Sequence, residues 1–293
     1  MRVLVTGASG LIGSALVPAL TAGGHEVVRL RRGSPVDGDL HWDPAAGTID
    51  NLSGIDAVVH LAGVGIGEKR WTDSQKRSIL DSRTIGTRLL SEAIAAAEPR
   101  PRALLSASAI GYYGDRGEDE LTEEDGPGSD FQADVCVAWE AGTTSAEAAG
   151  VRTVHMRTGL VLASHGGVLK RMLLPFKLGL GGRVGSGDQF MSWISMEDTI
   201  GAMMHLLETD LSGPVNLTAP NPVTNAEFTR TLGKTVKRPT FLPTPLLPLK
   251  AVYGRELVET LLLSSLRVVG TRLADGGYRF RHPTLEAALR AVV

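Results

Sequence analysis

The chain has 293 residues, of which 43% are hydrophobic and 21% charged, with a net charge of −2. This composition is that of a globular protein with a substantial core and excludes a disordered chain. The basic residues are scattered, which argues against nucleic acid as a partner, and no apolar run approaches the roughly 18 residues of a membrane-spanning helix. A single cysteine, Cys136, excludes an internal disulfide and a multi-cysteine site, and we expect no metal. The N-terminus resembles no signal peptide, so a cytoplasmic location is expected.

The first half of the chain alternates between buried strands and amphipathic helices. Apolar runs that end in glycine predict strands, and apolar residues at helical spacing predict helices. The strands are expected at 2–6, 25–30, 56–63, 102–110 and 152–162, and the helices at 14–23, 72–97 and 131–149. Strands separated by crossover helices imply an α/β fold with a doubly wound, Rossmann-type parallel sheet that binds ligands at the carboxyl ends of its strands.

The sequence pattern changes after residue 163, where glycine-rich, apolar and proline-rich segments replace the regular alternation of predicted strands and helices. We expect residues 1–163 to form a Rossmann domain, with residues 191–218 returning to it. Residues 164–190 and 219–293 are expected to form a smaller C-terminal domain that acts as a lid and builds the substrate pocket.

The stretch "TGASGLIG" places Gly7, Gly10 and Gly13 between the first strand and the first helix. The first glycine permits a tight turn, the second lets the backbone approach a pyrophosphate, and the third lets helix and strand pack closely. The phosphates then lie at the helix N-terminus. The cofactor contacts predicted from this loop are Gly7, Ser9, Gly10, Leu11, Ile12 and Gly13.

The end of the second expected strand, "VVRLRRG", indicates which cofactor is bound. An NAD site usually has Asp or Glu here to hold the ribose 2′-hydroxyl, whereas Arg31 and Arg32 stand here in this chain. A guanidinium can bind a 2′-phosphate with two hydrogen bonds, and Ser34 adds a hydroxyl. We therefore expect NADP(H); a solvated basic strand end is the alternative.

The segment 56–63 is expected to line the adenosine side of the site, with contacts from Asp56, Leu61, Ala62 and Gly63. Asp56 has an equally good interpretation as a cap or turn residue. His60 is expected to be a packed strand residue.

Several motifs together carry a family resemblance: "TGASGLIG", "HLAG", "SASAIGYYG", "MRTGLVL" and "FMSWISMEDTIGAMMHLLE". The chain resembles the extended, epimerase-like branch of the short-chain dehydrogenase/reductase superfamily. The stretches "CVAWE" and "RLADGGYRFRHPTLEAAL" resemble, more narrowly, epimerase family proteins of the SDR39U1 type, which have a C-terminal domain of unknown function. The resemblance implies a Rossmann fold, a bound nicotinamide cofactor, and a Ser–Tyr–Lys set in which tyrosine transfers a proton.

Carried over residue by residue, that catalytic set is missing. Glu140 matches the acidic residue that follows the lysine by four, which puts Cys136 in the lysine place and Gln132 in the tyrosine place. The serine place is Ala109, with Ser108 one residue before it. The sequence has no Tyr-x-x-x-Lys at any other position.

The candidates to replace the missing acid are Tyr112 and Ser108. Tyr112 has three open interpretations, namely the acid, a substrate contact and a packing residue, and Cys136 is expected to be a small buried hydrophobe. The resemblance places Ser106, Gly159 and Val161 near the cofactor. The predicted substrate contacts are Tyr113, Arg183, Phe190 and Trp193.

Two functions follow from these residues. The first is an NADP(H)-dependent oxidoreductase or epimerase-like enzyme with a rebuilt proton-transfer site, acting on a small molecule as a monomer or homodimer. The second is a catalytically silent NADP(H)-binding sensor or regulatory protein.

Overall fold

The fold is built on one large parallel sheet. The computed structural model describes residues 1–33 and 36–293, so the predicted cofactor contact Ser34 lies outside the described residues. The sheet has eight strands in the order β12-β8-β6-β5-β1-β2-β3-β4, and only the β3–β4 pair is antiparallel. The strands are β1 (Arg2–Thr6), β2 (Glu26–Arg31), β3 (Leu40–Asp43), β4 (Thr48–Ile49), β5 (Ala57–His60), β6 (Ala103–Ala109), β8 (Arg152–Thr158) and β12 (Gly213–Leu217). The predicted Rossmann-type α/β fold is confirmed.

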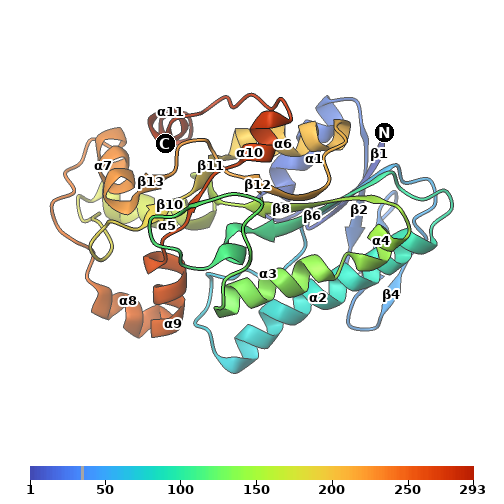
Figure 1. Cartoon of the computed structure of the whole chain (residues 1–293), viewed down its shortest axis with the longest axis horizontal. Coiled ribbons are helices and arrows are strands. Elements are labelled where there is room, and N and C mark those ends of the chain that lie inside the picture. Colours follow the sequence, from blue (N-terminus) through green and yellow to red (C-terminus); the bar gives the residue numbers. More distant parts are fainter. Residues whose placement is uncertain (34–35) are drawn as a thin grey trace.

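Helices cover both faces of this sheet (Figure 1). The helices α1 (Gly13–Ala22) and α6 (Met196–Glu208) pack on one face, where Leu16, Leu20 and Leu206 are fully buried. The other face carries α2 (Asp73–Ala96), α3 (Phe131–Ala141) and α4 (Thr144–Ala148). The helix predicted at 131–149 is therefore two helices, because the chain turns at Gly142 before α4 begins.

The predicted strand 152–162 also divides into two. It breaks at Gly159 into β8 and β9 (Leu160–Leu162), and β9 pairs with β11 (Trp193–Ser195) instead of joining the large sheet. A Cβ atom at Gly159 would lie 2.7 Å from the carbonyl oxygen of Ser192, so only glycine fits where the chain leaves the sheet.

The helices α5, α7 and α11 form a second core at one end of the molecule (Figure 1). Leu169, Phe228 and Leu289 are fully buried in it. The remaining elements are η1 (Ile110–Tyr113), β7 (Glu120–Leu121), α5 (Gly167–Lys177), β10 (Phe190–Met191), β13 (Val223–Thr224), α7 (Asn225–Thr235), α8 (Leu246–Tyr253), α9 (Arg255–Val258), η2 (Glu259–Leu263), β14 (Arg267–Val268), α10 (Thr271–Asp275) and α11 (Leu285–Val292).

The segment 271–282, which the sequence places in the small domain, packs on the large sheet. Leu273 of α10 belongs to the same core as α1 and α6. Asp198, fully buried in α6, accepts hydrogen bonds from the Tyr278 hydroxyl at 3.1 Å and from the backbone N–H of Arg281 at 2.7 Å and His282 at 3.0 Å. These contacts fix the C-terminal segment against the Rossmann part of the chain.

Candidate functional site

The glycine loop between β1 and α1 fits tightly against the end of β5. Gly7 has φ +66°, and a Cβ atom there would lie 2.7 Å from the carbonyl carbon of Leu61. A Cβ atom at Gly13 would lie 2.2 Å from the carbonyl oxygen of Gly7. The loop can therefore fold back on itself only because both positions lack side chains, as the sequence motif predicts.

The same loop presents unpaired donors at the start of α1. Among the described residues, no protein acceptor takes the backbone N–H groups of Leu11, Ile12 and Gly13, while Ser9 and Gly10 are exposed. Free N–H groups and the positive end of the helix dipole favour an anion, so a dinucleotide pyrophosphate fits this loop.

The end of β5 is shaped by Thr6 and His60. The Thr6 hydroxyl oxygen accepts from the N–H groups of Leu61 at 3.0 Å and Ala62 at 3.1 Å. It also lies 2.7 Å from Nδ1 of His60, whose Nε2 lies 2.9 Å from the Thr87 hydroxyl. Complete burial lowers the pKa of His60 to about 4, so the imidazole is neutral and packed, as predicted.

Arg31 and Arg32 are exposed at the end of β2, one strand away from the glycine loop. An Asp39 carboxylate oxygen lies 3.1 Å from Nη1 of Arg31 and orients its guanidinium. Two adjacent cations at this place suit a phosphate on the adenosine ribose.

Asp56 does not lie where the sequence places it. It precedes β5 and therefore sits at the amino edge of the sheet, opposite the glycine loop. Its carboxylate accepts from the N–H of Arg2 at 2.6 Å, and its backbone pairs with Arg2 and Arg102. The predicted cofactor contact is wrong, and the alternative of a structural turn residue holds.

Three other predicted cofactor residues lie in different settings. Ser106 is fully buried in the middle of β6, three residues before the strand ends, and its hydroxyl has no partner among the described residues. Gly159 and Val161 are half-buried where the chain leaves the sheet after β8. The Leu11 side chain reaches this segment, since a Cβ atom on Gly166 would lie 2.4 Å from it.

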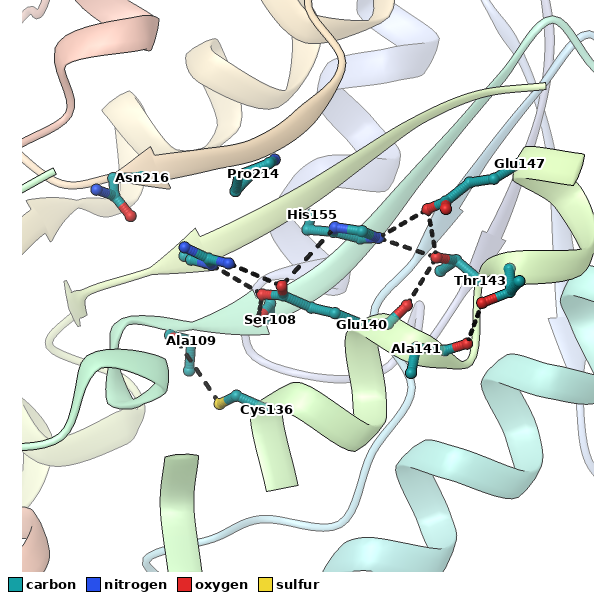
Figure 2. A network of polar contacts seen from close by, with 12 residues as sticks. Ser108, Ala109, Cys136, Glu140, Ala141, Thr143, Glu147, His155, Pro214 and Asn216 are labelled. Carbon is teal, nitrogen blue, oxygen red and sulfur yellow. Dashed lines mark hydrogen bonds and ion pairs between the residues drawn. The ribbon is translucent and has the colours of Figure 1, made fainter. Parts of the chain in front are cut away.

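A buried ionic network occupies the ends of β6 and β8 (Figure 2). Both oxygens of Glu140 bind Arg157, with 2.9 Å from Nε to Oε1 and 2.9 Å from Nη2 to Oε2. The Ser108 hydroxyl, 4% exposed, donates to Oε1 of Glu140 at 2.6 Å. The Ser108 hydroxyl thus helps to hold α3 on the sheet. Because it is buried, it is not accessible to a substrate, which argues against its predicted role as a proton donor.

Tyr113 and Trp193 are core residues, which overturns their predicted contact with substrate. The Tyr113 hydroxyl donates to Oδ1 of Asn216 at 2.8 Å and accepts from Arg157 at 3.1 Å. Burial is the main cause that raises the pKa of Tyr113 to about 12. Trp193 has no exposed surface, and its indole N–H donates to the carbonyl of Asn221 at 3.1 Å. From the sequence alone, an aromatic residue in a glycine-rich segment is equally compatible with the lining of a substrate pocket and with the hydrophobic core.

Tyr112 is the half-buried partner of this pair. Its ring lies 3.4 Å from the guanidinium carbon of Arg157 and meets the Tyr113 ring edge-on. In the described part of the chain its hydroxyl has no hydrogen-bond partner. Arg116 does not reach the phenol, because it donates to the carbonyls of Tyr113, Gly126 and Pro127.

Gln132 and Cys136 of α3 both pack against the chain where β6 ends. A Cβ atom at Gly111 would lie 2.2 Å from the amide carbon of Gln132, so this side chain lies over the turn that follows β6. Cys136 is 2% exposed, and its thiol lies 3.7 Å from the carbonyl oxygen of Ala109. Burial raises the pKa of Cys136 to about 12, which confirms the expectation of a buried, unreactive residue.

The remaining substrate candidates are Arg183, in the loop that follows α5, and Phe190, in β10. Arg183 is exposed. Phe190 is half-buried, with the Arg267 guanidinium 5.3 Å from its ring centroid. Leu266, which packs in the same cluster as Tyr112, donates its N–H to the Phe190 carbonyl. Phe190 and Tyr112 therefore border the same segment.

Two further buried charges are not among the residues singled out from the sequence. Glu123 is 5% exposed and accepts from the Asn216 N–H at 3.0 Å and the Thr271 hydroxyl at 2.6 Å. Arg83 is 8% exposed on α2. The signal for Arg83 was its spacing of four residues from the buried Ile79, which puts it on the apolar face of the helix.

Within residues 1–33 and 36–293 the structure contains neither a membrane-spanning helix nor a metal-binding cluster. No helix there has the length and apolarity to cross a membrane. No group of three or more His, Cys, Asp or Glu side chains there is placed to hold a metal ion.

Comparison with known proteins assigns the chain to a family. The model of the NAD dependent epimerase/dehydratase family matches residues 3–217, and that of a domain of unknown function (DUF1731) matches residues 244–292. The epimerase family protein MT2273 of Mycobacterium tuberculosis is 45% identical over 98% of this chain and 96% of its own length. The human epimerase family protein SDR39U1 is 39% identical, with 100% of both chains covered.

Solved structures agree with these matches. The crystal structure of human SDR39U1 with NADPH superposes with a TM-score of 0.91 at 38% identity, covering 100% of this chain and 99% of that chain. A UDP-galactose 4-epimerase structure, 20% identical with a TM-score of 0.73, shares the fold. The chain belongs to the NAD dependent epimerase/dehydratase family and, within it, is of the SDR39U1 type.

Proposed function

We propose that this chain binds NADP(H) along the carboxyl edge of its sheet and acts on a small molecule as an oxidoreductase or epimerase-like enzyme. One observation carries the proposal: a glycine loop with unpaired N–H groups lies one strand away from the exposed pair Arg31 and Arg32. The NADPH in the crystal structure of human SDR39U1 supports the same cofactor. The nicotinamide, when bound, supplies hydride transfer.

The chain's own residues divide the work of binding. The N–H groups of the glycine loop would hold the pyrophosphate, and Arg31 with Arg32 would hold the 2′-phosphate. Leu61, Ala62 and Gly63 would border the bound cofactor from the end of β5, since this segment touches the glycine loop.

Tyr112 is the residue that we assign to proton transfer. It is the half-buried phenol at the end of β6, and its hydroxyl is not engaged by another described residue. The guanidinium of Arg157 lies against its ring, 3.4 Å from the ring centroid, and holds the phenol in place. Gln132 is a hydrogen-bonding group without a titratable proton, so it would orient a substrate rather than ionise it.

A binding titration tests the cofactor assignment. We expect the protein to bind NADPH more tightly than NADH, and the variant Arg31→Asp with Arg32→Ala to lose this preference. The variant Arg77→Asp with Arg88→Ala changes the net charge equally at exposed positions of α2 and serves as the matched control. Equal affinities of all three proteins for NADPH would contradict the assignment.

A catalytically silent sensor is the second candidate, and the environment of α3 favours it. The amide of Gln132 does not titrate, and burial raises the pKa of Cys136 to about 12, so neither side chain can serve as a proton donor at neutral pH. Oxidation of NADPH measured across a panel of carbonyls and enones separates the two functions. The enzyme predicts turnover of at least one compound, lowered about a hundredfold or more by Tyr112→Phe. The sensor predicts tight binding of NADPH without turnover of any.

A further inference from the structure

Arg83 is a buried cation without a counter-charge. Its residue is 8% exposed, and within residues 1–33 and 36–293 no carboxylate oxygen lies within 4.0 Å of its guanidinium. Nη1 donates to the backbone carbonyls of Val64 at 3.0 Å and Ile79 at 3.1 Å. Since burial of an unpaired charge is costly, its persistence calls for a further partner.

The guanidinium lies between the loop after β5 and helix α3. A Cβ atom built on Gly63 would lie 3.5 Å from its Cζ atom. On the other side its Cζ atom lies 4.7 Å from the ring centroid of Trp139, whose buried indole N–H has no acceptor among the described residues. The Arg83 guanidinium and the Trp139 indole N–H are thus two hydrogen-bond donors in a region with few protein acceptors.

Arg83 also lies close to the position that the family's lysine would occupy. Burial raises the pKa of the Cys136 thiol, and the positive charge of Arg83 opposes this rise. Cys136 of α3 stands where the family resemblance puts the lysine. The cation near this position is therefore Arg83, which comes from α2.

We infer that Arg83 binds the hydroxyls of the nicotinamide ribose of NADP(H) and so takes over the cofactor-holding part of the missing lysine. The inference rests on the proposed binding of NADP(H). Nε and Nη2 of Arg83 donate to no acceptor in the described part of the chain, and a ribose diol offers two oxygens to such a fork. A guanidinium remains charged at all ordinary pH values, so Arg83 positions the cofactor and takes no part in proton transfer.

Three ligands locate the contact on the cofactor. Adenosine 2′,5′-bisphosphate contains the adenosine half, adenosine 2′-phosphate 5′-diphosphate adds the pyrophosphate, and only NADPH adds the nicotinamide ribose. We expect Arg83→Gln to weaken NADPH binding about tenfold or more, as for loss of a charged hydrogen bond, and to leave the affinities for both shorter ligands within about twofold. Titration calorimetry of the wild type and the variant measures all six affinities.

Each outcome decides the inference. Unchanged NADPH binding overturns it, and so does an equal loss for adenosine 2′-phosphate 5′-diphosphate, which would place Arg83 on the pyrophosphate. Arg31→Asp provides the contrast, because it should weaken all three ligands. If the wild type binds none of them, the proposed function fails instead.

Arg83→Lys covers the case in which the glutamine variant does not fold. It keeps the cation and the apolar stem but loses the forked donor, so we expect a loss of about threefold or more that is confined to NADPH. A second readout is nicotinamide fluorescence, whose intensity in the bound state reports the environment of the ring. Wild-type affinity and fluorescence in Arg83→Lys would overturn the inference.

Discussion

Glu140 binds Arg157 through both carboxylate oxygens at 2.9 Å each, and both side chains are almost completely buried. Glu140 comes from α3 and Arg157 from β8, so the pair fastens this helix to the large sheet.

This pair predicts a large and non-additive effect on stability. Glu140→Gln should lower the free energy of unfolding by about 3 kcal/mol, because Arg157 is left as an uncompensated buried charge. Combining Glu140→Gln with Arg157→Met should cost less than the sum of the two single changes. Urea unfolding measures all three variants. Glu286→Gln, which breaks an exposed pair with Arg290, should cost less than about 1 kcal/mol; an equal cost at both sites would refute the argument.

The same substitution, tyrosine to phenylalanine, should lower the stability of the protein at Tyr113 but hardly change it at the adjacent Tyr112. Tyr113→Phe removes a buried hydroxyl that contacts Asn216 and Arg157, so we expect about 1 to 3 kcal/mol less stability. Tyr112→Phe removes a hydroxyl that has no partner among the described residues and should leave stability within about 0.5 kcal/mol. Thermal unfolding gives the comparison, and a stable Tyr113→Phe variant would show that its network is not needed.

Two glycines of the cofactor loop separate folding from binding. A Cβ atom at Gly13 meets the Gly7 carbonyl at 2.2 Å, whereas one at Gly10 has only a 3.2 Å contact with the same oxygen. We expect Gly13→Ala to destabilise the fold by about 2 kcal/mol or more. Gly10→Ala should cost about 1 kcal/mol or less but weaken NADPH binding at least tenfold, since its side chain stands where the pyrophosphate approaches. Strong NADPH binding by Gly10→Ala would contradict this placement.

His60 predicts a defined pH dependence of stability. Its pKa is about 4 in the folded protein and about 6.5 in an unfolded chain. Between these values the unfolded state binds the proton and the folded state does not, so the free energy of unfolding falls as the pH is lowered from about 6.5 to 4. The loss from this residue approaches about 3 kcal/mol near pH 4.

The control for this prediction is His60→Gln, which cannot titrate. Its unfolding free energy should fall less steeply than that of the wild type over the same pH range, measured by urea titration at several pH values. His155, whose pKa is also lowered by burial, contributes equally to both proteins and cancels in the difference. Parallel curves would show that His60 does not control the slope.

The sequence determined the features that depend on short-range pattern. The glycine spacing, the alternation of strands and helices, and the absence of Tyr-x-x-x-Lys are all local, and each was confirmed or is directly visible in the chain. The glycine loop is the clearest case, since the conflict of a Cβ atom at Gly13 with Gly7 arises within seven residues and requires no distant partner.

Only the tertiary structure decided what the polar side chains face. Ser108 and Tyr113 read as candidates for catalysis and substrate binding, yet their hydroxyls are taken by Glu140 and Asn216, which are 32 and 103 residues away in sequence. Asp56 reads as a cofactor contact or a turn residue, and its hydrogen bond with the backbone of Arg2, 54 residues away in sequence, fixes it as the latter at the amino edge of the sheet. The setting of Arg83 is likewise decided by the tertiary structure, because its guanidinium lies against the ring of Trp139 in α3, 56 residues later in the chain.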